Sequence, residues 1–563
     1  MAPKTGLDIN LERITDVETR ASVVRLLNLV EELAAELREA RAEIQRLRDE
    51  INRLKGEQGK PEIRPQATVL ATDHSSERER REPKPRVKRS KKTILRIDRE
   101  VTLPVDRATL PADAVFKGYA PVVVQDVVFR TETTRFRKEV WYSALEGKTY
   151  RAPLPAGYQG QFGPKLKAFV LAVSTIGLMS EGALLSLLRS AGLLISAGTL
   201  SDLLIKNQDL FHDEKAAVVE AGLRSTPWQH TDDTATRVNG QNEHCHVLCN
   251  PLFTAYFTLP GKDRLTVLDV LRGGAPRVHR VTPTVLSSLA HLGVPAGACT
   301  IVKQWPHDQD LSADRLTELL RTELPWLGQK HQHTIAEATA LAAYHDQSDW
   351  PVIETLVCDD APQFKSLTET RSLCWVHEGR HYQKLTPYLA HHQRELTHFR
   401  RRFWSFYRDL LAYQDAPIPA GRIRLRRRFD RLFGTVTGYA ALDARIAATR
   451  AKKTSLLLVL DHPELPLHNN SAELAARRRV RKRDVSFGPR TRDGTNAWDT
   501  FQSLAATAQK LGISFYDYLQ DRIGKLHQIP PLADLIADRA RDHNLGASWP
   551  GWPLPGPRHA FSS

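Results

Sequence analysis

A heptad repeat of apolar residues is the first pattern along the chain. Ten positions alternate three and four residues apart: Val23, Leu26, Val30, Leu33, Leu37, Ala40, Ile44, Leu47, Ile51 and Leu54. One alternate set is mainly β-branched and the other mostly leucine, which favours two parallel strands in a coiled coil. We therefore expect residues 1–58 to form a coiled coil that joins at least two copies. An amphipathic helix packed on its own domain is the alternative.

The next two segments differ in composition. Residues 59–99 contain prolines and few large apolar groups, and 11 lysines and arginines stand against three acids between Arg78 and Arg99. Such a run is ordinarily a solvated arm, and in a basic protein it also suits phosphate contact. Residues 100–160 alternate apolar and polar positions, which predicts a small β-rich module.

Helical spacing begins next. Residues 161–226 include two apolar helices around a short break with glycine, and Thr199 or Ser201 is a candidate cap of the second helix. The pattern suits a DNA-binding helix-turn-helix, although such helix pairs are common in other folds.

The central part is expected to be an α/β core that spans residues 227–375. Three runs that begin at Trp228 predict consecutive antiparallel strands, and the apolar run before Asp359 predicts a buried strand. Residues 272–350 are mixed, mainly helical, and long enough to be an extra insertion. The remaining divisions are a helical insertion domain at 376–460, a second core part at 461–528 and a C-terminal tail at 529–563.

The composition adds a basic surplus and few cysteines. The 80 lysines and arginines against 65 acids give a formal net charge of +15. This favours a polyanionic partner such as nucleic acid, although many soluble proteins are mildly basic. Five cysteines with no CxxC pair exclude a disulfide scaffold and a zinc ribbon. No run suits a bilayer span or a secretory signal, so we expect a cytoplasmic protein without a membrane partner.

Three acidic positions are candidates for metal chemistry. Asp232 lies on the first predicted strand, Asp359 ends the buried strand, and Glu473 lies in a later helix. Buried carboxylates are costly unless a cation pairs with them, and oxygen ligands suit Mg²⁺, with Mn²⁺ as a substitute. Two such ions stabilise the attacking and leaving oxygens at phosphorus. Each acid also has an ordinary alternative as a helix cap or an N-terminal helix charge.

Basic residues surround the third acid. After Glu473, six of the seven residues from Arg477 to Arg483 are basic, which suits contact with a phosphate backbone or a solvated helix end. The candidate DNA contacts are Arg477, Arg478, Arg481, Lys482, Arg483, Arg401 and Arg427.

The order of these motifs resembles a known family. The motifs are Asp232-Asp233-Thr234, Leu356-Val357-Cys358-Asp359, Cys374-Trp375-Val376-His377 and Asn469-Asn470-Ser471-Ala472-Glu473. The closing stretch adds Arg483, Phe487, Gly494, Leu504, Thr507, Ala508, Gly512 and Tyr516-Asp517-Tyr518-Leu519. Together they resemble the transposases of the IS-sixty-six family of bacterial insertion sequences, over roughly residues 160 to 520.

This resemblance implies a ribonuclease-H-like mixed sheet with a DDE catalytic triad. The family places one Asp on the first strand, one after the fourth strand and a Glu on a later helix, which correspond to Asp232, Asp359 and Glu473. Asp233, Asp360 and His377 would then support these ligands. The implied activity is metal-dependent cleavage of double-stranded DNA at transposon ends and strand transfer into target DNA, near the bacterial nucleoid and with accessory proteins. The chain departs from the family in having no cysteine within residues 100–160.

Two alternatives stay open. The first is a catalytically silent DNA-binding regulator that dimerises through its coiled coil. The second is a ribonuclease-H-like nuclease that cuts without joining.

Overall fold

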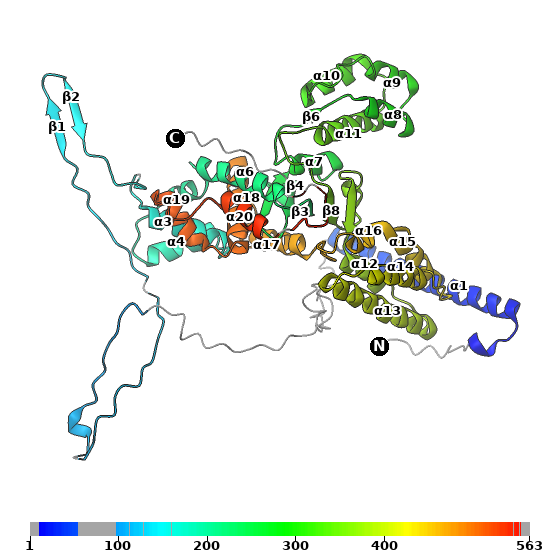
Figure 1. Cartoon of the computed structure of the whole chain (residues 1–563), viewed down its shortest axis with the longest axis horizontal. Coiled ribbons are helices and arrows are strands. Elements are labelled where there is room, and N and C mark those ends of the chain that lie inside the picture. The colour runs from blue at the N-terminus through cyan, green and yellow to red at the C-terminus, as the bar shows by residue number, and fades with distance from the viewer. Residues whose placement is uncertain are drawn as a thin grey trace.

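The protein is a mixed α/β protein with several outlying parts (Figure 1). The structure is a computed structural model, and it describes residues 11–54, 97–543 (without 112, 128 and 159), 545–550 and 552. The basic run expected within residues 59–99 therefore lies almost wholly outside the described residues. No helix among the described residues is both long enough and apolar enough to cross a membrane.

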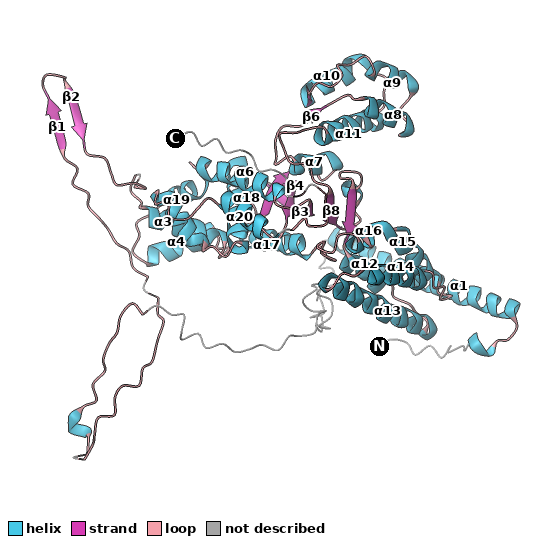
Figure 2. Cartoon of the chain, in the orientation of Figure 1, coloured by secondary structure: helices cyan, strands magenta, loops and turns pink. Residues whose placement is uncertain are grey.

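A five-stranded sheet forms the centre, in the order β5–β4–β3–β8–β9 (Figure 2). Its strands are β3 (Trp228–Val238), β4 (Gln241–Cys249), β5 (Thr254–Leu259), β8 (Thr355–Cys358) and β9 (Thr370–Leu373). β3, β4 and β5 are antiparallel neighbours, whereas β8 runs parallel to β3 and β9 runs parallel to β8. The three antiparallel strands and the buried strand before Asp359 are thus confirmed.

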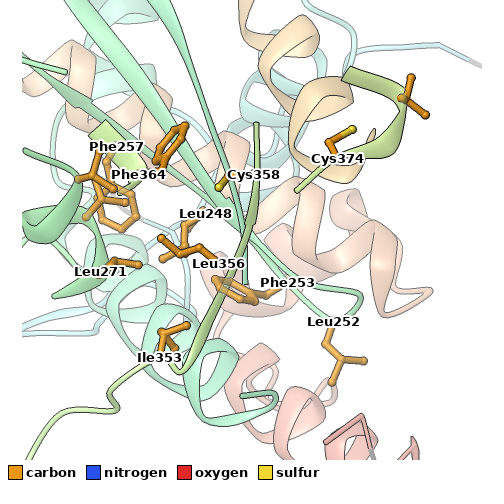
Figure 3. Packing of buried hydrophobic residues seen from close by; sticks show 14 of the residues in the cluster. Leu248, Leu252, Phe253, Phe257, Leu271, Ile353, Leu356, Cys358, Phe364 and Cys374 are labelled. Carbon is orange, nitrogen blue, oxygen red and sulfur yellow. The ribbon is translucent and has the colours of Figure 1, made fainter. Parts of the chain in front are cut away.

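Different helices cover the two faces of this sheet. Cys245 and Val247 of β4 pack against Ala472 and Ala476 of α17 (Asn470–Ser486) on one face. Leu248 points to the other face, where it joins the main apolar core with α6 (Asp209–Arg224) and α7 (Arg264–Leu271). Figure 3 shows Leu248 beside Leu356 and Phe253 in this core.

The edge strand β5 is covered by α18 (Arg492–Lys510). Backbone N–H groups of β5 donate to side chains of this helix, at 3.1 Å to Thr507, 2.9 Å to Ser503 and 2.7 Å to Asp499. An open strand edge invites pairing with other chains, and these polar side chains close it.

Residues 272–350 form a separate helical lobe, as the sequence predicts (Figure 1). Its elements are β6 (Val278–His279), α8 (Pro283–His291), α9 (Ala296–Val302), β7 (Leu311–Ser312), α10 (Ala313–Glu323) and α11 (Gln329–His345). The lobe has an apolar core of its own, which includes Leu289, Leu320 and Ile335. A separate core is consistent with an insertion into the sheet domain.

The helical segment 376–460 is also confirmed. Its helices are α12 (Trp375–Gln383), α13 (Ala390–Asp415), α14 (Pro419–Phe433), α15 (Ala440–Ala451) and α16 (Lys453–Leu456). The fully buried Trp375 ring contacts the rings of Phe403, Phe406, Phe429 and Phe433. This aromatic cluster fixes α12, and with it the residues that α12 presents to the sheet.

Helix α1 (Val17–Leu54) packs on these helices through one face only. The buried carboxylate of Glu31 accepts hydrogen bonds from the backbone N–H of Tyr388 and Leu389, and Asn28 bonds the loop before α15. The heptad positions Val23 and Val30 also pack in this contact, whereas the following stay exposed: Leu26, Leu33, Leu37, Ile44, Leu47, Ile51 and Leu54. The helix therefore both docks on its own chain and leaves an apolar seam open.

The β-rich module expected at 100–160 contains fewer strands than the pattern predicts. It has a single hairpin of β1 (Val140–Ser143) and β2 (Lys148–Arg151), and the rest of the described segment is extended chain with one short helical turn. Most of its apolar side chains are exposed, including Val122, Trp141 and Leu145. Alternation alone predicts strands, but a strand forms only where a partner strand accepts its hydrogen bonds.

The remaining helices lie beside the sheet. They are α3 (Pro164–Thr175), α4 (Glu181–Ser190), α5 (Ala197–Ile205), α19 (Phe515–Gly524) and α20 (Leu532–His543). The predicted helix pair is α4 and α5, but its cap is Ser196, whose hydroxyl accepts from the Thr199 N–H, and neither Thr199 nor Ser201. The expected C-terminal tail contains α20, which packs on α6 through the buried Leu532 and Ile536.

Candidate active site

Asp232 lies on the face of β3 that is covered by α17. It pairs in register with Val247, which packs against α17, whereas Asp233 pairs with His246 on the opposite face. Because side chains alternate along a strand, adjacent acids cannot share a face. The geometry therefore selects Asp232, and not Asp233, as the acid that faces Glu473.

The other two acids reach the same place from distant parts of the sequence. Asp359 directly follows β8, the parallel neighbour of β3, and Glu473 lies in the first turn of α17. α17 contacts both β3 and β4. The three carboxylates predicted from the sequence thus come together beside the neighbouring central strands β3 and β8, at the start of α17.

The electrostatics of Asp232 report this closeness. Burial, together with the negative charges of Glu473 and Asp359, raises the pKa of Asp232 to about 7. The N–H of Asp233, which donates to the Asp232 carboxylate at 2.9 Å, partly opposes the shift. A buried carboxylate beside two others is a place where a cation lowers the energy.

Asn469 joins β3 to the start of α17. Its side-chain oxygen accepts from His230 Nδ1 at 2.9 Å, and its Nδ2 donates to the Thr231 carbonyl at 2.8 Å. Burial lowers the pKa of His230 to about 3, so the ring stays neutral. These bonds hold the residue that precedes α17 against the strand that carries Asp232.

Cys374 makes a second connection, between α12 and the start of α17. Its thiol sulfur accepts from the backbone N–H of Asn469 and from that of His377, both at 3.3 Å. One side chain therefore caps α12 and touches the beginning of α17. The Cys-Trp-Val-His element works here as a packed junction, because Trp375 is buried among aromatic rings directly beside it.

Arg380 of α12 holds Glu473. Its guanidinium donates to the Glu473 carboxylate at 2.7 Å, and both side chains are partly exposed. Among the described residues, no group of three or more His, Cys, Asp or Glu side chains is arranged so that it could hold a metal ion. Oxygen donors from Asp232, Asp359 and Glu473 nevertheless form the donor set that Mg²⁺ prefers.

The three supporting residues that the resemblance implies have separate surroundings. Asp233 accepts from Gln363 at 3.1 Å, and Asp360 lies 3.0 Å from the Lys452 amine. His377 lies near Asp359 and Glu473, and burial lowers its pKa while those two carboxylates raise it. Only His377 therefore faces the triad, since Asp233 and Asp360 are engaged elsewhere.

The candidate DNA-contacting residues differ in their exposure to solvent and in their hydrogen bonds. Arg477, Arg481, Arg401 and Arg427 are exposed. Arg478 donates to Gln509, and Arg483 donates to the Ala235 carbonyl. Lys482 is buried, and its amine donates to the Ser174 carbonyl at 2.5 Å. The structure thus turns Lys482 away from the exposed face of α17.

Sequence reasoning missed His230 and Arg380. His230 stands two residues before Asp232, so the strand period of two places both on one face, and that signal was available. Arg380 lies three residues after His377, but nothing in its local sequence indicates that it reaches Glu473, 93 residues away.

Comparison with known proteins gives one relative. No family model matches the chain. An alignment of 329 residues, 57% of this chain, covers the whole of the uncharacterized protein y4jO of Sinorhizobium fredii (strain NBRC 101917 / NGR234) at 35% identity. The chain belongs to the y4jO family. Membership of the y4jO family names no reaction, so the function has to come from the site.

Proposed function

We propose that the protein is a DNA transposase of the DDE type, which binds transposon ends and catalyses metal-dependent cleavage and strand transfer. The observation that carries the proposal is the convergence of Asp232, Asp359 and Glu473 beside the central strands β3 and β8. Their mutual charge is visible in the raised pKa of Asp232. A buried carboxylate whose pKa is raised by neighbouring carboxylates is typical of functional sites.

The order of the strands supports a ribonuclease-H-like core. If β3 is counted as the first strand of the sheet, β8 is the fourth. Asp232 then lies on the first strand, Asp359 follows the fourth, and Glu473 lies on a helix after a helical insertion. This is the placement that the resemblance to the IS-sixty-six transposases implies.

The three carboxylates supply oxygen donors, which Mg²⁺ and Mn²⁺ both prefer, and on this proposal they would hold two such ions. When bound, the ions stabilise the attacking and the leaving oxygen of an in-line displacement at phosphorus. Glu473 has to exchange its contact with Arg380 for a ligand role, or use its other oxygen. Asn469 and Cys374 keep α17 in position during that exchange.

Exposed arginines supply a path for the DNA backbone. Arg477 and Arg481 follow Glu473 at successive turns of α17, and Arg401 and Arg427 lie on the insertion helices α13 and α14. Guanidinium groups bind phosphates in a bidentate manner. Because each neutralised phosphate releases counterions, affinity for DNA should fall steeply as salt rises.

The open seam of α1 supports a parallel homodimer. In the heptad, Glu36 and Glu43 directly precede Leu37 and Ile44 of the first set, and Arg41 and Arg48 directly follow Ala40 and Leu47 of the second set. Parallel pairing sets Glu36 against Arg41 and Glu43 against Arg48 of the other copy, whereas antiparallel pairing sets like charges together. Two copies bring two active sites, which suits an enzyme that acts on two transposon ends.

The test uses purified protein and labelled double-stranded DNA that carries the sequences flanking its gene. We expect Mg²⁺-dependent nicking at the ends, followed by joined products with an unlabelled target plasmid. Cleavage without joined products would favour the nuclease alternative. Binding without either product, with Mn²⁺ also present, would favour the regulator.

A further inference from the structure

A cavity of about 590 Å³ lies between α3–α5 and the end of α17 with α18. Ligand sites commonly measure about 300–1,000 Å³. Its apolar walls include Leu171, Leu204, Ile205, Trp498 and Phe501. None of the three candidate catalytic acids lines it, so this is a second, separate site.

The cavity contains a buried hydrogen-bond donor. Gln502 is 3% exposed, and its Oε1 accepts from Arg479 at 2.5 Å. Since an arginine can only donate, this contact fixes which end of the amide is oxygen. The Nε2 of Gln502 has no hydrogen-bond partner within the part of the chain that the structure describes. A buried amide donor of this kind is suited to an acceptor on a ligand.

The mouth of the cavity is suited to an anion on one side. α18 begins there with Thr491 as its cap, and the preceding Arg490 is exposed. A helix N-terminus and a guanidinium together attract phosphate. Glu181 also lines the cavity, and it lies near the buried Lys482, whose charge offsets it.

An exposed aromatic residue lies at the same mouth. Phe487 lines the cavity, is 90% exposed, and has a left-handed backbone with φ of 59°. That conformation is costly for a bulky residue and is typical of functional positions. The loop after it is fastened to the β3–β4 hairpin by a bond from the Asn239 N–H to the Pro489 carbonyl at 3.1 Å. A loop that is bonded to the hairpin thus presents an apolar ring to solvent.

We propose that this cavity takes one deoxynucleotide extruded from the bound DNA, while Phe487 enters the base stack in its place. The proposal rests on the proposed function. The base lies between the apolar walls, where Gln502 donates to one of the acceptors that every base carries. The phosphate lies at the start of α18. Enzymes that extrude nucleotides offset the lost stacking with such pockets, and apolar wedges open the stack.

The geometry of α17 predicts where the extruded nucleotide lies. Two residues that line the cavity, Lys482 and Phe487, follow Glu473 by nine and 14 residues. At about 1.5 Å per helical residue these separations are about 13.5 and 21 Å. Successive nucleotides of a strand rise about 3.4 Å, so the nucleotide is about four to six positions from the cleaved phosphate.

The experiment measures affinity for end DNA with a single mismatch moved along the first ten positions. A mismatch at the extruded position removes part of the pairing cost, so wild-type protein should bind it about tenfold more tightly. Gly182→Leu is the blocking variant, because Gly182 lines the cavity and its Cβ position has no atom within 4 Å. Gly198→Leu is the matched control on α5, since Gly198 is also uncrowded but does not line the cavity.

We expect wild type and Gly198→Leu to bind the DNA more tightly when the mismatch is at one position. This gain in affinity should be lost in Gly182→Leu and in Phe487→Ala. DNA that is cleaved normally with no mismatch-sensitive position would overturn this proposal and leave the transposase function intact. A gain that survives Gly182→Leu would also overturn it. If end DNA is neither bound nor cut, both proposals fail. Deoxyadenosine monophosphate retained in equilibrium dialysis by wild type alone would then assign the cavity to free nucleotides.

Discussion

The ring of His230 is hydrogen-bonded to the side-chain oxygen of Asn469 at 2.9 Å, although 239 residues separate them. The bond ties β3 to the residue that precedes α17. Asp232 follows His230 by two residues and Glu473 follows Asn469 by four. One buried contact therefore sets the relative position of two candidate metal ligands.

Loss of this contact should impair chemistry more than DNA binding. In Asn469→Ala, two buried hydrogen bonds disappear, which costs about 1–3 kcal/mol of unfolding free energy. We expect cleavage to fall by more than tenfold, since small displacements of catalytic groups have large effects. Denaturant unfolding and a cleavage time course measure the two effects. Asn496→Ala, at an exposed site on α18, is the control. Unchanged cleavage in Asn469→Ala would show that the contact does not position Glu473.

Metal affinity should depend on pH through Asp232. Its pKa is raised to about 7, so below pH 7 a metal ion has to displace a proton. We expect the apparent Mn²⁺ affinity to rise by up to tenfold per unit between about pH 5 and 7 and to level off above it. Calorimetry in buffers of different ionisation enthalpy should show about one proton released at pH 6. In Asp232→Asn the proton release should disappear, and its persistence would assign the titration to another group.

Arg380 competes with a metal ion for Glu473. The ion pair is partly exposed, so its contribution is small, about 1 kcal/mol at most. Arg380→Gln should therefore tighten Mn²⁺ binding by up to about fivefold. Titration of both proteins at one pH and salt concentration measures the change. Arg424→Gln, at an exposed site on α14, should leave the affinity unaltered. Weaker binding in Arg380→Gln would mean that Arg380 orients Glu473 for the metal.

The open seam of α1 should control assembly. Leu37 is 51% exposed at the centre of the heptad, so Leu37→Glu adds a charge to the dimer interface while leaving the docked face intact. We expect sedimentation velocity to show dimer for wild type and monomer for this variant at micromolar concentration. Ala42→Glu, at an exposed position away from the seam, should remain dimeric. A wild-type monomer would leave the docking of α1 on its own chain as its only role.

Much of the fold follows from local patterns. The heptad repeat predicts α1, alternation of apolar and polar residues predicts β3 to β5, and the apolar run before Asp359 predicts β8. Each pattern has the period of the element that it forms. The prediction of a β-rich module at 100–160 fails because alternation of apolar and polar residues does not supply a partner strand. α20 was missed because three large apolar residues, Leu532, Leu535 and Ile536, are a weak signal until α6 lies beside them.

The candidate site was likewise only partly predictable from the sequence. Asp232, Asp359 and Glu473 were chosen from their places at strand ends and in a helix, together with the resemblance. Their convergence depends on long-range pairing between β3 and β8, which no local pattern encodes. Arg380 and Asn469 act across 93 and 239 residues, so only the folded chain shows what they contact.

The most direct measurement compares wild type with Glu473→Gln on labelled end DNA and a target plasmid in Mg²⁺. Asp484→Asn is the control, because Asp484 is an exposed acid on the same helix. We expect cut and joined products from wild type and from Asp484→Asn, and at least a thousandfold loss of both in Glu473→Gln with end binding preserved. Joined products from Glu473→Gln at the wild-type rate would contradict the three-carboxylate site.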